Sequence, residues 1–196
     1  MNKRFILIGF IFSYVLLLSG FKSSMSIESY MPKEDEYSIG MKVFGGVIFY
    51  IDKTNLHGLV VSVNNIGGSW MKYPWGCYGM SISDAEAIDV GSGRINTNAI
   101  LNSCPDKNSA AQACMDYQHE GYSDWFLPSL EELEMIAENL AYDDEFSEII
   151  NFDNDNYLSS TQLKNKKHQK NYAWSVNIKQ RYSTPTNKSN KQKIRA

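Results

Sequence analysis

The sequence predicts a mixed α+β domain with antiparallel strands, two or three short helices and long loops. Runs rich in β-branched and aromatic residues stand in the first third and again in the last third of the chain, as is typical of buried strands. Between them, apolar residues recur at the three- and four-residue spacing of an amphipathic helix. The chain has 196 residues, of which 43% are apolar, and this is enough for one packed core.

The first residues have the layout of a secretory signal. Lys3 and Arg4 precede an apolar run over residues 5–18 that only Gly9 and Ser13 interrupt. The run is shorter than the roughly 20 apolar residues of a membrane-spanning helix, and an uncleaved N-terminal anchor is the alternative. We therefore expect an exported protein, secreted, periplasmic or on the cell surface, that meets a membrane only through this segment. The expected parts are a signal or anchor, a linker and a folded domain, at residues 1–26, 27–39 and 40–196.

The strands fall into an early and a late group. Residues 43–51 and 58–63 are rich in β-branched and aromatic residues and are separated by a short polar turn, which predicts a hairpin. Residues 64–94 contain many glycines and little periodicity, so a long irregular loop is expected there. The later strands are predicted at residues 157–161, at 172–178 and from Lys193 onward.

Three helices are predicted between the two groups of strands. Their apolar faces are Thr97, Ile100, Leu101 and Cys104; Ala110, Ala113, Cys114 and Tyr117; and Leu130, Leu133, Ile136, Ala137 and Leu140. Ser129 and Glu132 have the spacing of a capping box, in which each side chain accepts a backbone N–H of the other. The acidic residues of the third helix are expected on its solvated face; these are Glu131, Glu132, Glu134 and Glu138.

The three cysteines are an odd number, so one of them is left over or pairs outside the chain. Cys104 and Cys114 lie on the apolar faces of neighbouring helices, and we favour them as the disulfide pair, with Cys77 free. Two buried free thiols are an equal alternative.

The motifs of common enzymes are absent from the sequence. His57, His119 and His168 do not pair at metal-binding spacing, and the chain has no Cys-x-x-Cys and no G-x-S-x-G motif. The acidic and amide residues 153–156 do not have the spacing of an EF-hand loop and are better explained as a polar turn. We therefore expect no enzyme activity, no catalytic residues, no cofactor and no metal site.

The charge is unevenly distributed along the chain. Residues 162–196 hold ten Lys or Arg and no acid, whereas all 22 acidic residues lie between residues 27 and 161. Intramolecular pairing is one explanation, and a basic face that attracts polyanions is the other. The candidate ligand-binding residues combine positive charge with rings that stack on sugars; they are Lys164, Lys166, Lys167, Lys170, Tyr172, Arg181, Tyr182 and Lys188.

Several motifs in the same order resemble one known family. They stand at residues 45–52, 57–60, 75–77, 91–93, 96–97, 110–114, 121–129, 131–133, 157–161 and 173–174. The stretch Gly-Tyr-Ser-Asp-Trp-Phe-Leu-Pro-Ser at residues 121–129 is the most specific of them. In these motifs the chain from about residue 40 to 196 resembles the Lcl C-terminal domain family of bacteria, which is named after the end domain of a collagen-like adhesin.

The resemblance implies a C-type-lectin-like fold, related to that of the formylglycine-generating enzymes. In such a fold the first and last strands pair, and a long loop region carries the ligand site. Trp125 and Pro128 would then fix a turn of the core and Trp174 a core strand. The calcium lectins' Glu-Pro-Asn signature is absent, and no cysteine follows Cys114, so neither calcium-dependent sugar binding nor formylglycine-type chemistry is expected.

The predicted function is therefore a secreted or surface-exposed binding module that recognises a polyanionic glycan, or another surface ligand such as a surface protein. Nucleic acid is not expected as a partner. The alternative is an envelope-associated structural or protein-interaction domain, and an enzyme of the formylglycine-generating type comes third.

Overall fold

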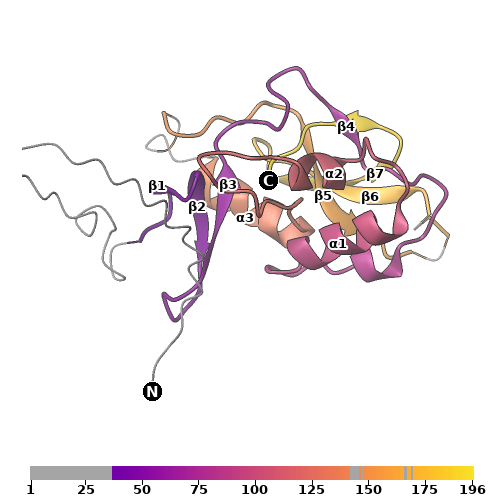
Figure 1. The fold of residues 1–196 in the computed structure, drawn as a ribbon, viewed down its shortest axis with the longest axis horizontal. Coiled ribbons are helices and arrows are strands. Elements are labelled where there is room, and N and C mark those ends of the chain that lie inside the picture. Colours follow the sequence, from indigo (N-terminus) through magenta and orange to yellow (C-terminus); the bar gives the residue numbers. More distant parts are fainter. Residues whose placement is uncertain (1–36, 142–145, 147, 166, 169) are drawn as a thin grey trace, which may run out of the picture. The chain divides into compact units, whose positions relative to one another are not determined.

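The computed structural model describes residues 37–141, 146, 148–165, 167–168 and 170–196, all of which belong to one compact unit. The expected signal or anchor at residues 1–26 and most of the expected linker lie outside the described residues. Figure 1 shows the order of the helices and strands along the chain. Among the residues that the structure describes, no helix has the length and apolar character needed to cross a membrane.

The first sheet is the predicted early hairpin with one short strand added. Its strands are β1 (Lys42–Val43), β2 (Gly46–Ile51) and β3 (Gly58–Ser62), antiparallel in the order β1-β2-β3. A β-bulge shifts the register between Ile48 and Tyr50. The two residues that join β1 to β2 are Phe44 and Gly45, both with positive φ, as a type I′ turn requires.

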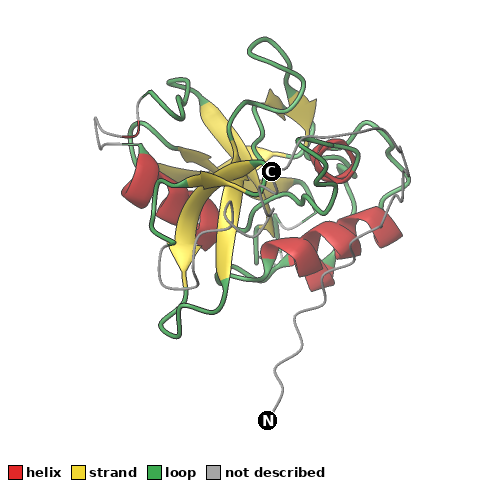
Figure 2. Cartoon of the chain, turned by 60° about the vertical axis from the view of Figure 1, so that its left-hand side comes forward, coloured by secondary structure: helices red, strands yellow, loops and turns green. Residues whose placement is uncertain are grey.

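The three predicted helices are confirmed. They are α1 (Gly93–Ser103), α2 (Ala110–Met115) and α3 (Leu130–Leu140), and the loop before them contains a short 3₁₀ turn, η2 (Ser83–Ala85). The α+β class is thus confirmed, and the three helices with several small antiparallel sheets are consistent with a C-type-lectin-like fold. Figure 2 shows the strands lying between helices on either side.

The capping box at the start of α3 is present as predicted, but one acidic residue of this helix is not on its solvated face. Ser129 Oγ accepts from Glu132 N, and Glu132 Oε2 accepts from Ser129 N at 2.8 Å. Glu132 is instead fully buried, and its second oxygen accepts the N–H groups of Gly91 and Gly93. Burial raises the pKa of Glu132, and the three backbone donors oppose that shift.

The second sheet contains one strand that the sequence pattern did not reveal. Its strands are β5 (Asn156–Gln162), β6 (Tyr172–Asn177) and β7 (Tyr182–Asn187), antiparallel in that order. The missed strand is β7, which is polar and contains Pro185. The two-stranded pair of β4 (Tyr73–Pro74) and β8 (Lys191–Gln192) replaces the strand expected from Lys193.

The core has two parts. One lies around Trp75, α1 and α2 and includes Ile100 and Leu127. The other lies where α3 packs on the strands of both larger sheets, around Leu133 and Val176. Trp125, from the most specific motif, is 5% exposed and belongs to the first part, whereas Trp174 is only half-buried.

Two cations near the end of the chain fasten this core to its loops. Arg195, 2% exposed, donates to the carbonyl oxygens of Ser62, Val63 and Asn151 and lies over the ring of Phe152. Residues 194–196 also run antiparallel to the chain that leaves β3, with Ser62 N donating to Ala196 O at 2.6 Å and Ile66 N donating to Ile194 O at 3.2 Å.

The second cation is Lys193, which is 6% exposed. Its Nζ donates to Ser69 O at 2.9 Å and forms an ion pair with Asp153. The Lys193 side chain therefore ties the long loop to the loop before β5. These two residues belong to the basic end of the sequence, yet their charges serve the interior of the fold.

Candidate functional site

The structure divides the predicted ligand-binding residues between the two ends of the β6–β7 pair. Tyr172 pairs with Asn187 at one end, and Tyr182 pairs with Asn177 at the other. Five residue steps of an extended strand separate these ends by roughly 17 Å. The eight candidates therefore do not form one continuous face.

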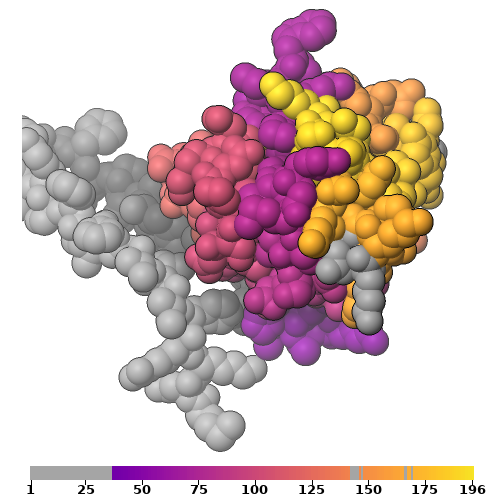
Figure 3. All heavy atoms as spheres, turned by 90° about the vertical axis from the view of Figure 1, so that its right-hand side faces the viewer, coloured from indigo at the N-terminus to yellow at the C-terminus, as the bar shows by residue number. Residues whose placement is uncertain are grey.

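The larger group lies where two loops meet. Lys164, Lys167 and Lys170 are exposed in the loop between β5 and β6, and Lys170 O accepts the N–H of Gly79 at 2.9 Å. That contact brings the lysine-bearing loop against the long loop that the resemblance marks as the ligand region. Figure 3 shows the long loop, in purple and magenta, against the orange and yellow C-terminal part.

Two exposed apolar side chains flank this contact in the long loop. Tyr78 is 56% exposed and Met80 is 42% exposed. Lys166, the remaining lysine of the predicted group, lies outside the described residues. We call the resulting surface the long-loop face, and its members are Tyr78, Met80, Lys164, Lys167, Lys170 and Tyr172.

Arg181 and Tyr182 lie elsewhere, beside α3. Arg181 Nη2 donates to Glu138 O at 3.4 Å, and Tyr182 OH donates to Asn156 Oδ1 at 3.4 Å. A ligand on the long-loop face would therefore not contact them.

The assignment of Lys188 to an exposed basic face is wrong. Lys188 is fully buried beneath the long-loop face, and its Nζ donates to Met80 O at 2.8 Å and to Gln162 Oε1 at 2.7 Å. The ammonium also lies 4.2 Å from the ring centre of Trp75, a cation–π distance. Desolvation lowers the pKa of Lys188 to about 8, and the carboxylate of Glu86 opposes this shift.

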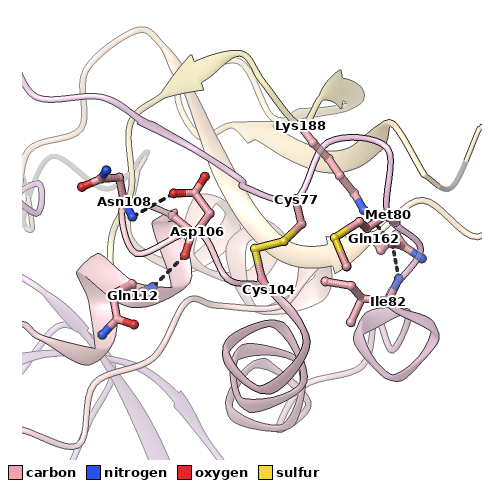
Figure 4. The surroundings of a disulfide bond; sticks show 10 residues. Cys77, Met80, Ile82, Cys104, Asp106, Asn108, Gln112, Gln162 and Lys188 are labelled. Atoms are coloured by element: carbon pink, nitrogen blue, oxygen red, sulfur yellow. Dashed lines mark hydrogen bonds between the residues drawn. A yellow bond between two sulfur atoms is a disulfide. The ribbon is translucent and has the colours of Figure 1, made fainter.

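Gln162, at the end of β5, completes this buried polar cluster. Its Oε1 accepts from Ile82 N at 2.8 Å as well as from Lys188, while its Nε2 donates to Ser81 and Glu86. Figure 4 shows the Lys188 side chain pointing toward Met80 and Gln162, close to the disulfide. One lysine and one glutamine thus bond to the backbone of Met80 and Ile82 and to the side chains of Ser81 and Glu86. The cluster holds a segment of the loop that has little regular structure apart from the short η2 turn.

The disulfide joins Cys77 to Cys104, so the predicted Cys104–Cys114 pair is wrong. The Cα atoms of Cys77 and Cys104 are 5.6 Å apart, an ordinary disulfide separation. Cys104 follows α1 as its C-cap, where the positive φ of Gly76 and Cys77 turns the long loop toward it. A Cβ at Gly76 would come within 2.8 Å of Ser109, so this turn needs a glycine.

Cys114 is the remaining cysteine, and it is buried. Its Sγ lies 3.8 Å from Arg195 O rather than facing Cys104. Burial raises the pKa of the Cys114 thiol well above its usual range, so this sulfur is a poor nucleophile. The helical pattern correctly placed both sulfurs on apolar faces, but it could not show that the two faces pack on different neighbours.

The two tryptophans of the long loop have opposite environments. Trp75 is fully buried and its Nε1 donates to Ser159 O at 3.0 Å, whereas Trp70 is 97% exposed. Trp75 therefore supports the loop, and Trp70 is open to solvent or to a partner.

The long-loop face offers charge and aromatic surface rather than reactive groups. Lysine ammonium groups donate charge-assisted hydrogen bonds to sulfate, phosphate or carboxylate, and tyrosine rings provide flat contact area. Across the described part of the chain, no group of three or more His, Cys, Asp or Glu is arranged to hold a metal ion.

The comparisons with known proteins agree with the resemblance noted in the sequence. The sequence model of the family described as Lcl C-terminal domain matches residues 67–196, which include the whole long-loop face and the disulfide. A search of curated proteins found no match. The match covers well over half of the chain, and the chain belongs to the Lcl C-terminal domain family.

Proposed function

We propose that this protein is an exported binding module that recognises a polyanionic glycan on the long-loop face, without catalysis. Membership of the Lcl C-terminal domain family is the established part of this statement. The ligand, the site and the absence of chemistry are our proposal, and they are supported by the arrangement of charges on that face.

The observation that carries the proposal is a contrast among the lysines of the basic segment. Lys188 and Lys193 are buried and have hydrogen-bond or ion-pair partners within the fold, but Lys164, Lys167 and Lys170 are exposed and form no ion pair with any acid in the described part of the chain. Their charge is therefore directed to solvent. A sulfated or carboxylated chain passing over the face could contact several of them at once, and such binding weakens as salt screens the field.

The support beneath the face favours recognition by a preformed surface. Cys77–Cys104 fastens the middle of the loop to the C-terminal end of α1, and the Lys188–Gln162 cluster holds the segment that follows. A surface that is already ordered loses less conformational entropy when it binds a ligand. The disulfide is also consistent with an oxidising compartment, which supports the export part of the proposal.

Heparin-column retention at matched salt tests the ligand. Replacing Lys164, Lys167 and Lys170 with Glu should move elution to clearly lower salt. The matched control replaces three exposed lysines of other elements with Glu: Lys42 of β1, Lys53 between β2 and β3, and Lys179 between β6 and β7. Both triple variants have the same net charge, so only a local site separates them.

Equal loss of retention in both triple variants would show that heparin senses net charge alone. Retention unchanged in the variant of the face would remove this face as the ligand site. In either case the domain would be better explained as an envelope-associated protein-interaction domain, the alternative function. Circular dichroism of each variant checks that the fold is intact.

A further inference from the structure

An amide, an amine and a carboxylate from three separate segments meet where the long loop begins. The backbones of two of these segments are in contact, since Ile66 N donates to Ile194 O at 3.2 Å. Asp153 Oδ2 accepts from Asn65 Nδ2 at 2.7 Å and also from Lys193 Nζ. Two donors that share one acceptor oxygen lie roughly 6 Å apart or less, because each hydrogen bond is about 3 Å long. The amine of Lys193 therefore lies close to the amide of Asn65.

The hydroxyl group of Tyr157 completes this group of side chains. It donates to Asn65 Oδ1 at 3.1 Å, and its oxygen accepts from Asp153 N at 3.0 Å. Burial raises the pKa of Tyr157, so the phenol keeps the proton that it donates. A fixed donor on the carbonyl oxygen polarises the amide carbon, as the donors of an oxyanion hole do. We call Asn65, Asp153, Tyr157 and Lys193 the Lys193 cluster.

The cluster is shielded from water on most sides. Asn65, Tyr157 and Lys193 are buried, and the ring of Phe152 meets that of Tyr157 edge-on, with centroids 6.1 Å apart. Asp153 is half-exposed, and its pKa is lowered chiefly by the hydrogen bond from Lys193, so the resting pair is ionic. Moving one proton along this hydrogen bond gives a neutral amine, which is the nucleophilic form of lysine.

The Lys188–Gln162 cluster provides the contrast, because it also contains a buried lysine, an amide and an acid. There the lysine donates to the amide oxygen, and Glu86 accepts from Gln162 Nε2. Within the described part of the chain, no carboxylate is hydrogen-bonded to both nitrogens of that cluster. In the Lys193 cluster a single oxygen of Asp153 bonds to both nitrogens, so one group can take a proton from the amine and pass it to the amide.

We propose that Lys193 and Asn65 form an intramolecular isopeptide bond, with Asp153 as the acid–base group. Asp153 takes a proton from Nζ, and the neutral amine attacks Cγ of Asn65 while Tyr157 stabilises the charge on Oδ1. In total, two protons pass from Nζ to Nδ2, the Nζ–Cγ bond forms, the Cγ–Nδ2 bond breaks, and an ammonium ion leaves. The step consumes no oxidant, reductant or cofactor.

The fold supplies the conditions that such a bond needs. Groups held together within one fold react as if at very high concentration, and each molecule reacts only once, so slow chemistry is sufficient. The product joins the start of the long loop covalently to the segment that follows β8, where the ion pair and the hydrogen bond to Ser69 O otherwise hold it. This proposal is independent of glycan binding on the long-loop face.

Tryptic digestion of the reduced and alkylated protein, followed by tandem mass spectrometry, tests the proposal. Trypsin does not cut after an acylated lysine, so the bond appears as a branched peptide that joins residues 54–72 to residues 192–195. Its mass is lower by one ammonia molecule than that of the two linear peptides together. No branched peptide should join Lys188 to Gln162. Only linear peptides from the Lys193 cluster of the wild type would overturn the proposal.

Two substitutions of neighbouring acids test the role of Asp153. Asp153→Asn keeps the size of the side chain but cannot carry the proton, so the yield of branched peptide should fall by about a hundredfold. The matched control is Asp155→Asn, because Asp155 pairs with Lys72 outside the cluster, and its yield should equal that of the wild type. Circular dichroism checks that both variants are folded. An equal yield from Asp153→Asn and wild type would overturn the proposed acid–base step.

Discussion

Two sets of cations from the same basic stretch of sequence have opposite roles. Lys188, Lys193 and Arg195 are buried and bond to backbone carbonyls, a glutamine or an aspartate. The three lysines of the long-loop face are exposed and have no described acid partner. A run of Lys and Arg in the sequence therefore does not by itself predict an exposed basic surface. A long cationic side chain can also be buried, where it donates hydrogen bonds to several carbonyl oxygens of an irregular loop region at once.

Among the buried cations, we expect the substitution Arg195→Met to cause the largest loss of stability. Ser62, Val63 and Asn151 would lose the donor to their carbonyl oxygens, of which that of Ser62 is buried, and Phe152 would lose the guanidinium over its ring; together these losses should lower the free energy of unfolding by about 4 kcal/mol. Urea denaturation measures the change. Arg94→Met, at a half-exposed position, is the control and should cost about 1 kcal/mol or less.

Removing the disulfide tests whether binding depends on an ordered long loop as well as on its positive charge. Cys77 and Cys104 are 27 residues apart, and the double Ala variant should lose about 3 kcal/mol of stability because its unfolded chain is less constrained. Heparin retention should also fall while all three lysines remain. Cys114→Ala keeps the bridge and should cost less, through lost packing alone; equal losses in the two variants would contradict the assigned pairing.

The buried Lys188 predicts an unusual dependence of stability on pH. Its pKa is about 8 in the fold and near 10.5 when unfolded, so between these values the unfolded chain binds the proton and the folded chain does not. The free energy of unfolding should therefore rise as the pH increases from 8 toward 9.5.

Lys188→Met isolates this contribution, because the thiol of Cys114, whose pKa is raised by burial, acts in the opposite sense above about pH 9. The wild type should gain stability relative to Lys188→Met over this range. A constant difference between the two proteins would show that Lys188 keeps its ordinary pKa and is not desolvated as described.

The smallest effect is expected for the exposed set. Replacing Lys164, Lys167 and Lys170 with Ala should change the free energy of unfolding by less than about 1 kcal/mol in total, because exposed charges without partners contribute little. A larger loss, measured by the same urea denaturation, would place these lysines among the structural cations and remove the contrast.

Local patterns predicted the parts of the fold that local chemistry determines. The capping box of Ser129 and Glu132 and the three helical faces needed only neighbours within a few residues, and all were confirmed. The strand β7 was missed because Tyr182–Asn187 is mostly polar and is held by its pairing with β6, a partner that the segment's own pattern does not show.

The candidate site was predicted only in its exposed half. The lysine-rich loop was recognised from composition, but burial of Lys188 depends on Trp75 and Gln162, which are distant in sequence. The same limit explains the cysteine error, since Cys104 at the end of α1 and Cys114 in α2 are both buried, and only the fold shows that Cys77 reaches Cys104. The periodicity of apolar residues indicates which side chains are buried, but it does not show which distant segments pack together.

The unequal tryptophans of the long loop give the protein an internal optical reporter. Indole emission shifts to longer wavelength in water, and charged groups and disulfides nearby reduce its yield. Trp75 lies beneath an ammonium group and two residues from a bridged cysteine, whereas Trp70 is almost wholly in solvent. Trp125 is buried and Trp174 is half-buried, so Trp70 is the tryptophan that a soluble quencher reaches most readily, and the difference between wild type and Trp70→Phe reads the environment of this one loop without a label.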